Sequence, residues 1–208
     1  PRAAGRMLML GCWLYQCTGN EALLTRMRER MHKSYLPCWD GRDFKTDKVR
    51  PMAIKKPDGR MLKGKAAYWN PWQESMAAVG FFALYKTTGD TTAKMMADTI
   101  ATTTLRHGWL VNRSDARVGY AMKWNPDGSP LTEQQKITSD PLVCKWAGGG
   151  ITAWSVGAVE VARHFALARQ DKSLTLKADT ILQRLRANSN RPPKSGWWDD
   201  FREWDAVR

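Results

Sequence analysis

An internal repeat is the feature of this sequence that most constrains its fold. A set of five residues in the first fifth of the chain recurs in the same order further along, as Leu14, Tyr15, Thr18, Gly19, Asn20 and then Leu84, Tyr85, Thr88, Gly89, Asp90. A second set recurs later still, as Ala97, Asp98, Thr99, Ile100 and then Ala178, Asp179, Thr180, Ile181. Such self-similarity is typical of a supersecondary unit that is repeated so that neighbouring units share one core. The sequence therefore predicts three units of one design.

The middle unit shows what each unit is. Residues 71–87 are apolar on nearly all sides and start with Pro71, which a first helical turn tolerates, so they predict a buried helix. Gly89 supplies a helix C-cap, and Asp90 or Thr91 can cap the next helix. Residues 91–106 have one apolar face, typical of a half-exposed outer helix. Residues 3–17 with 20–33, and 150–168 with 172–187, repeat this pattern. We expect a mainly α fold of three antiparallel helical hairpins.

The connections between the units follow a second pattern. Residues 49–68 and 118–132 each carry two short extended stretches around Pro-Asp-Gly, a tight-turn sequence, and each predicts a small β-hairpin insertion. Residues 191–208 form a Trp-rich C-terminal tail that we expect to dock on the body. The predicted organisation is a repeat domain over 1–190, with units at about 1–40, 69–110 and 146–188, followed by this tail.

This order of inner helix, Thr-Gly-Asp/Asn turn, outer helix and β-insertion resembles the α/α-toroid superfamily of six-hairpin glycosidases and polysaccharide lyases. The resemblance rests on Gly5, Arg6, Leu14, Tyr15, Thr18, Gly19, Asn20 and on Phe82, Ala83, Leu84, Tyr85, Thr88, Gly89, Asp90. A complete ring in that superfamily holds more hairpins than the three counted here. We therefore expect an open arc or partial toroid whose apolar ends are covered by a partner or by the rest of a ring. Because the first residue is Pro1, we also expect a processed product or a piece of a longer chain.

The segment from Tyr68 to Glu74 lies where a loop enters an inner helix. The resemblance implies that loops at this end line a substrate cleft, with aromatic rings stacking on sugars. It makes ligand-binding candidates of Trp69, Asn70, Trp72, Gln73, Trp146 and Trp154. The alternative is that these tryptophans pack between hairpins and that Glu74 favours the helix start electrostatically.

Catalytic residues are harder to nominate. Glycoside hydrolysis usually needs two carboxylates, for which Glu74, Asp40 and Asp140 are available. Lyase chemistry needs a base and a group that neutralises the substrate carboxylate, roles open to Tyr68 or His107 and to Asn70 or Arg60. Tyr68, Glu74 and His107 are thus weak candidates, and none is assigned. The four cysteines lack metal-ligand spacing, so we expect no metal or cofactor. We expect the cysteines to be free thiols.

Positive charge is concentrated in one insertion. The chain carries 33 Lys and Arg against 20 Asp and Glu, a formal charge of +13. Residues 42–65 contain three acidic residues and a predicted basic contact patch of Arg42, Lys45, Lys48, Arg50, Lys55, Lys56, Arg60, Lys63 and Lys65. Such a patch attracts polyanions, for example an acidic polysaccharide or, without sequence specificity, nucleic acid. No apolar run approaches the ~20 residues of a membrane span, and no signal peptide is recognised, so we expect a soluble chain of unassigned location.

Two functions follow from these observations. The first is a non-catalytic structural or binding module of a larger assembly, such as a virus or phage particle, contacting other protein subunits through the basic insertion and the tail. The alternative is a carbohydrate-active enzyme acting on an acidic glycan, either a polysaccharide lyase or a glycoside hydrolase, or a fragment of one. The incomplete ring and the lack of an acid/base pair favour the first.

Overall fold

The computed structural model of the protein describes residues 2–36, 68–123, 125, 129–138, 144–147, 151–152 and 154–189. The whole predicted basic patch at 42–65 and the tail at 191–208 lie outside the described residues. So do Asp40, Asp140 and the first insertion up to residue 67. For Tyr68 and Trp69 the structure describes the backbone alone.

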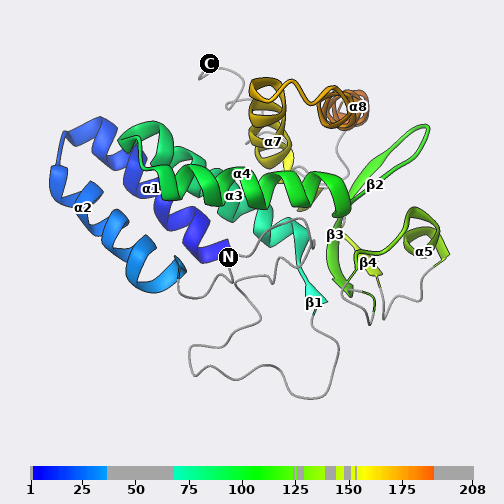
Figure 1. Ribbon diagram of the computed structural model, residues 1–208, viewed down its shortest axis with the longest axis horizontal. Helices are drawn as coiled ribbons and strands as arrows, with labels where there is room; N and C mark the ends of the chain where they lie inside the picture. The colour runs from blue at the N-terminus through cyan, green and yellow to red at the C-terminus, as the bar shows by residue number, and fades with distance from the viewer. Residues whose placement is uncertain are drawn as a thin grey trace.

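The described chain is mainly helical, with three consecutive pairs of helices (Figure 1). The first pair is α1 (Arg2–Thr18) with α2 (Glu21–Arg30), which continues into the short π-helix η1 (Met31–Tyr35). The second is α3 (Pro71–Thr88) with α4 (Thr91–His107), and the third is α7 (Val156–Ala168) with α8 (Lys172–Ser189). A short helix, α5 (Glu133–Thr138), precedes the third pair. The inner helix expected from residue 150 thus begins, as α7, at residue 156. None of the described helices is long and apolar enough to cross a membrane.

The turns within the first two pairs confirm the predicted capping. Gly19 and Gly89 adopt φ values of 66° and 70°, a left-handed conformation that costs glycine little. The Asp90 side chain then accepts hydrogen bonds from the backbone N–H groups of Thr92 and Ala93, both at 2.9 Å. Asn20 accepts one such bond, from Ala22 at 3.1 Å. These local signals set where each helix ends and the next begins.

The inner helices α1, α3 and α7 pack side by side. Gly5 of α1 lies against Met76 of α3, and Cys12, further along α1, lies near Thr87 at the end of α3, so the two helices run in the same direction. On another side of α3, Phe82 meets Phe165 of α7 edge to face, with ring centroids 5.7 Å apart. The central helix α3 therefore supplies much of the core, including Trp72, Met76, Ala77, Ala78, Phe81 and Leu84.

The third pair is not a simple continuation of the first two. In Figure 1, α4 runs across the picture, whereas α8 is seen nearly end-on. α8 therefore crosses α4 steeply. Its first turns contact the end of α4, where Lys177 donates to the Arg106 carbonyl at 2.7 Å, and its last turn reaches the β2–β3 connection through Asn188.

A small antiparallel sheet is built around one strand, β3 (Ala116–Lys123). The first half of β3 pairs with β2 (Trp109–Val111), and its second half lies between β1 (Tyr68–Trp69) and β4 (Cys144–Trp146).

This arrangement differs from the self-contained hairpin predicted at 118–132. Residues 118–123 are extended, but their strand partners come from the connections before α3, after α4 and before α7. Beyond the strand, the Asn125 N–H donates to the Ser129 carbonyl at 2.9 Å, shortly before α5. The physical reason is burial: Val118 and Met122 of β3 are 0% and 2% exposed, which requires cover from elements distant in sequence.

Candidate functional sites

The start of α3, nominated from the sequence as a binding cleft, is packed. Asn70 is the N-cap residue, and its carbonyl accepts the N–H groups of Gln73 and Glu74 at 2.9 and 3.0 Å. The Trp72 side chain is only 6% exposed, and its ring stacks on Tyr120 of β3 with centroids 5.5 Å apart and planes 10° apart. The Arg2 guanidinium lies 5.8 Å from the same ring. Trp72 therefore joins α1, α3 and β3, which favours the packing alternative.

The other nominated tryptophans pack against different neighbours. Trp146, on β4, covers a small cluster of Met122, Leu131 and Cys144. Trp154, partly buried before α7, has the Arg6 guanidinium of α1 at 4.5 Å from its ring centroid. A cation in this position is attracted by the negative face of the ring. Each described ring thus has its own structural contact.

The two nominated catalytic residues whose side chains are described lie on different helices. Glu74 is 1% exposed and belongs to the core face of α3. His107 is the last residue of α4, beside Gly108 at its C-cap. Among the described residues, no group of three His, Cys, Asp or Glu side chains could hold a metal ion.

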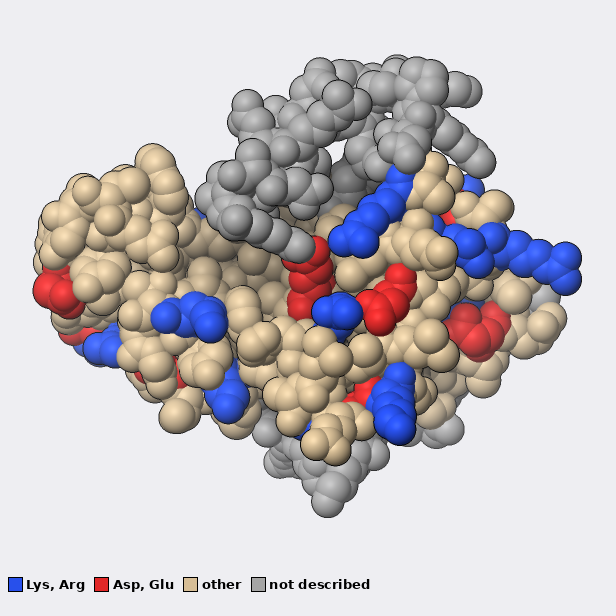
Figure 2. Space-filling view, turned by 90° about the horizontal axis from the view of Figure 1, so that it is seen from above, with Lys and Arg blue, Asp and Glu red and all other residues tan. Residues whose placement is uncertain are grey.

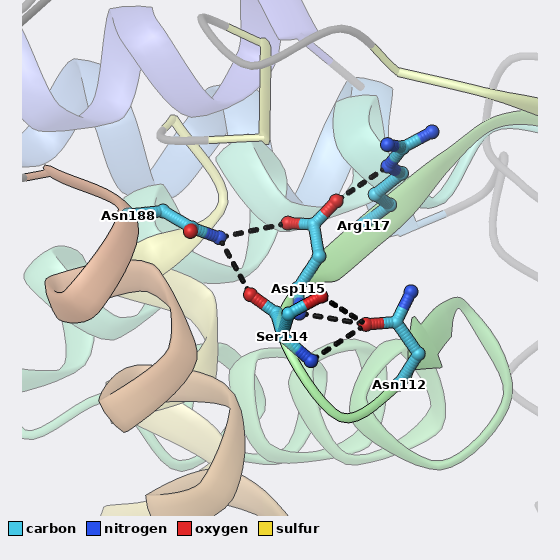
Figure 3. Close-up of a pocket in the computed structure, with 5 residues that line it drawn as sticks. All are labelled: Asn112, Ser114, Asp115, Arg117 and Asn188. Carbon is cyan, nitrogen blue, oxygen red and sulfur yellow. Dashed lines mark hydrogen bonds and ion pairs between the residues drawn. The ribbon is translucent and has the colours of Figure 1, made fainter. Parts of the chain in front are cut away.

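A polar hollow of about 330 Å³ lies where α8 ends against the β2–β3 connection (Figure 3). The Asp115 carboxylate accepts hydrogen bonds from Asn188 at 3.0 Å and from the Arg117 guanidinium at 2.6 Å. Asn112 accepts the N–H groups of Ser114 and Asp115 at 3.0 and 2.7 Å. These groups bond to one another, so the cluster fastens the connection to α8.

A second hollow, of about 400 Å³, lies between β2, α5 and α8. It is lined by Trp109, Val111, Glu133, Ser173, Leu176, Lys177 and Thr180. Beside it lies Lys136, whose side chain is 1% exposed and donates to the Trp109 carbonyl at 3.3 Å and to Glu133 at 2.7 Å. Burial lowers the pKa of Lys177, the charge of Lys136 lowers it further, and the Glu133 carboxylate partly opposes both effects. Sequence reasoning missed this pair, since neither lysine belongs to a motif.

One face of α1 is apolar and exposed. Met7, Leu10 and Trp13 are 52%, 51% and 58% exposed, whereas Leu8 and Cys12 are 2% and 3% exposed. Since successive helical residues are turned by about 100°, the exposed set faces away from the side that Leu8 and Cys12 bury against the core. The helix therefore has two apolar faces, and none of the described residues covers the second one.

Several charged side chains of the described residues form ion pairs. Seen from above in Figure 2, Lys and Arg lie next to Asp and Glu across the middle of the face. Two ion pairs join the α7–α8 turn to α4: Arg106 meets Asp171 at 3.4 Å, and Arg169 meets Asp98. A third pair joins α7 to α8, where Arg163 meets Asp179 at 2.5 Å. A polyanion approaching this face meets alternating charges.

Compared with protein-family models, with curated proteins and with solved structures, the chain matches none.

Proposed function

We propose that this chain is a non-catalytic scaffold module of a larger assembly, for instance a virus or phage particle, built as a partial α/α toroid of helical hairpins. Its contact surface is the face of α1 that carries Met7, Leu10 and Trp13, here named the α1 face. The occupant is the inner helix of a further helical pair of the same plan. The observation that carries this proposal is that no described residue covers the apolar side chains of Met7, Leu10 and Trp13, which remain about half exposed on α1.

The comparison with α3 supports this occupant. α3 has an inner helix on each of two sides: Gly80 lies against Gly5 of α1, and Val79 lies against Gly157 of α7. Within the described residues, α1 packs on α3 and on its own outer helix α2, where its Gly11 meets Met27. The α1 face lies opposite α3, which is where a preceding inner helix would continue the row. In repeat proteins, each unit covers its neighbour in this way.

The free energy gained by burying the α1 face limits which partners can bind to it. Completing the burial of three side chains that are each about half exposed contributes roughly 1 kcal/mol per side chain. Association costs at least about 4 kcal/mol in lost rigid-body freedom. The α1 face alone therefore does not hold a free helix, and the partner must present a whole helical pair or be held by other contacts of the assembly.

The carbohydrate-active alternative is less well supported. The burial of Trp72 and Glu74 leaves neither exposed to a glycan, and the nominated tryptophans Trp146 and Trp154 already have protein contacts. Depolymerisation of a uronate-containing glycan by the purified chain, abolished by Glu74→Gln, would instead establish the enzyme.

The test is site-specific photo-crosslinking within the native assembly. A photoreactive residue replaces Leu10 on the α1 face or, as the matched control, Met95 of the outer helix α4, which is 46% exposed. We expect position 10, and not position 95, to crosslink to one protein peptide, identified by mass spectrometry, with the apolar pattern of an inner helix. Crosslinks to glycan, nucleic acid or solvent alone at position 10, or equal yields at both positions, contradict the proposal.

A further inference from the structure

The hollow between β2, α5 and α8 has features that a scaffold does not need. Its volume of about 400 Å³ lies within the roughly 300–1,000 Å³ range of small-molecule sites. Its lining combines apolar groups, from Val111 and Leu176, with hydroxyls, from Ser173 and Thr180, and with one amine and one carboxylate. Such a mixture can hold a small organic molecule and orient its polar end.

One lysine lines this hollow, and a second, from another element, bonds to two of its lining residues. Lys136 of α5 is 1% exposed and is held by the Trp109 carbonyl and by Glu133. Lys177 of α8 lines the hollow, and its Nζ atom donates to the Arg106 carbonyl at 2.7 Å. Lys136 is thus a cation held by two partners, whereas Lys177 lines the hollow and its amine donates to a backbone carbonyl.

We propose that this hollow binds a small carbonyl compound, an aldehyde or ketone, and that Lys177 forms an imine with it. The neutral amine nitrogen attacks the carbonyl carbon, and a proton moves from nitrogen to the carbonyl oxygen to give a carbinolamine. The remaining N–H proton is then transferred to the hydroxyl oxygen, the carbon–oxygen bond breaks, water leaves, and the carbon–nitrogen double bond forms. No atom changes its overall oxidation level, so neither an oxidant nor a reductant is required.

The surroundings of Lys177 supply the neutral amine that this reaction needs. A lysine is nucleophilic when burial or a neighbouring cation favours its uncharged form. α5 contributes one such cation, Lys136, and one opposing carboxylate, Glu133. At the end of α4, the Arg106 guanidinium pairs with Asp171, which partly cancels its charge toward Lys177. The strand β2 adds no charged side chain, because its residues are Trp109, Leu110 and Val111. The proposal is independent of the scaffold role and of the α1 face.

The experiment is reductive alkylation of the full chain with propionaldehyde and sodium cyanoborohydride near neutral pH, read lysine by lysine by peptide mass spectrometry. The control is Lys172, an exposed lysine of the same helix. We expect Lys177 to be modified severalfold faster than Lys172, with a rate that saturates as the aldehyde concentration rises. Modification of Lys177 no faster than that of Lys172 refutes the reactive amine, and a rate linear in aldehyde refutes the binding site.

Two variants test the electrostatic part. Lys136→Met removes the neighbouring cation, and we expect the rate at Lys177 to fall toward that of Lys172. Glu133→Gln removes the opposing carboxylate from a side chain that is 59% exposed, so the fold is kept, and the rate at Lys177 should rise. If Lys136→Met does not fold, as judged by its far-UV circular dichroism, Glu133→Gln decides alone. An unchanged or lower rate in Glu133→Gln overturns the proposal.

Discussion

Replacing Gly5 of α1 with alanine places a methyl group against the backbone of α3. A Cβ atom at this position would lie 2.0 Å from the carbonyl oxygen of Met76 and 2.8 Å from the backbone nitrogen of Ala77. The approach is mutual, because a Cβ atom on Gly80 would lie 2.5 Å from the Gly5 carbonyl oxygen. Backbone atoms of a helix cannot rotate away as a side chain can, so the two helices must separate.

The expected loss of stability follows from this geometry. Ordinary contact begins near 3.4 Å, so the helices must separate by more than about 1 Å, which forfeits a quarter to a half of the dispersion energy at the interface. Overpacking of this kind costs about 1–3 kcal/mol, and backbone obstruction points to the upper end. The greater helix propensity of alanine offsets up to about 1 kcal/mol of this loss of stability. We therefore expect Gly5→Ala to lower the free energy of unfolding by about 2 kcal/mol.

The matched control is Gly11→Ala in the same helix. Its Cβ atom would meet the Met27 sulfur at 2.2 Å, but that atom ends a flexible side chain that can adopt another rotamer. We expect a change within about 0.5 kcal/mol. Equilibrium urea unfolding, followed by far-UV circular dichroism, measures both variants. If Gly5→Ala is as stable as the original chain, α1 and α3 are not in close backbone contact and the reasoning fails.

Three further predictions concern capping, thiols and pH. Asp90→Ala removes two N-cap hydrogen bonds and should cost about 1–2 kcal/mol, more than Asn20→Ala, which removes one; equal losses in urea unfolding would contradict this ranking. The exposed Cys17 should react with iodoacetamide in the native chain, whereas Cys12 should react only in denaturant, because burial shields its thiol and raises its pKa; peptide mass spectrometry that finds equal rates would refute this. Because the pKa of Lys177 is lowered by folding from its ordinary value of 10.5, the unfolded chain binds the proton more readily, and this lysine's contribution to stability should improve as pH rises toward that value. Subtracting the unfolding free energy of Lys177→Met from that of the original chain across alkaline pH isolates the effect, and a difference that falls with pH has the wrong sign.

Much of the helical organisation could be predicted because its signals are local. Gly89 ends one helix with a positive φ, and the Asp90 side chain caps the next helix by accepting two backbone N–H groups. Both residues act on groups only a few positions away in the sequence. The second insertion was harder, since extended residues alone do not identify their strand partners. β3 pairs with strands before α3, after α4 and before α7, and these pairings depend on how the helices bring the connections together.

The candidate sites were less predictable. Trp72 and Glu74 were nominated by their place at a helix start, but burial depends on Tyr120 and the rest of the core, which the segment itself does not contain. Lys136 and Lys177 carried no signal, because each reads as an ordinary charged helix residue. Their proximity follows from the packing of α5 beside β2 and the first turns of α8.

The sequence by itself determined that helices come in pairs and where the helices of the first two pairs meet, because caps and turns act between neighbouring residues. Only the tertiary structure decided which apolar face of α1 is buried, how steeply α8 crosses α4, and which lysine is enclosed. Both faces of α1 are apolar in sequence, and the choice between them was made by the close approach of Gly5 to the backbone of α3.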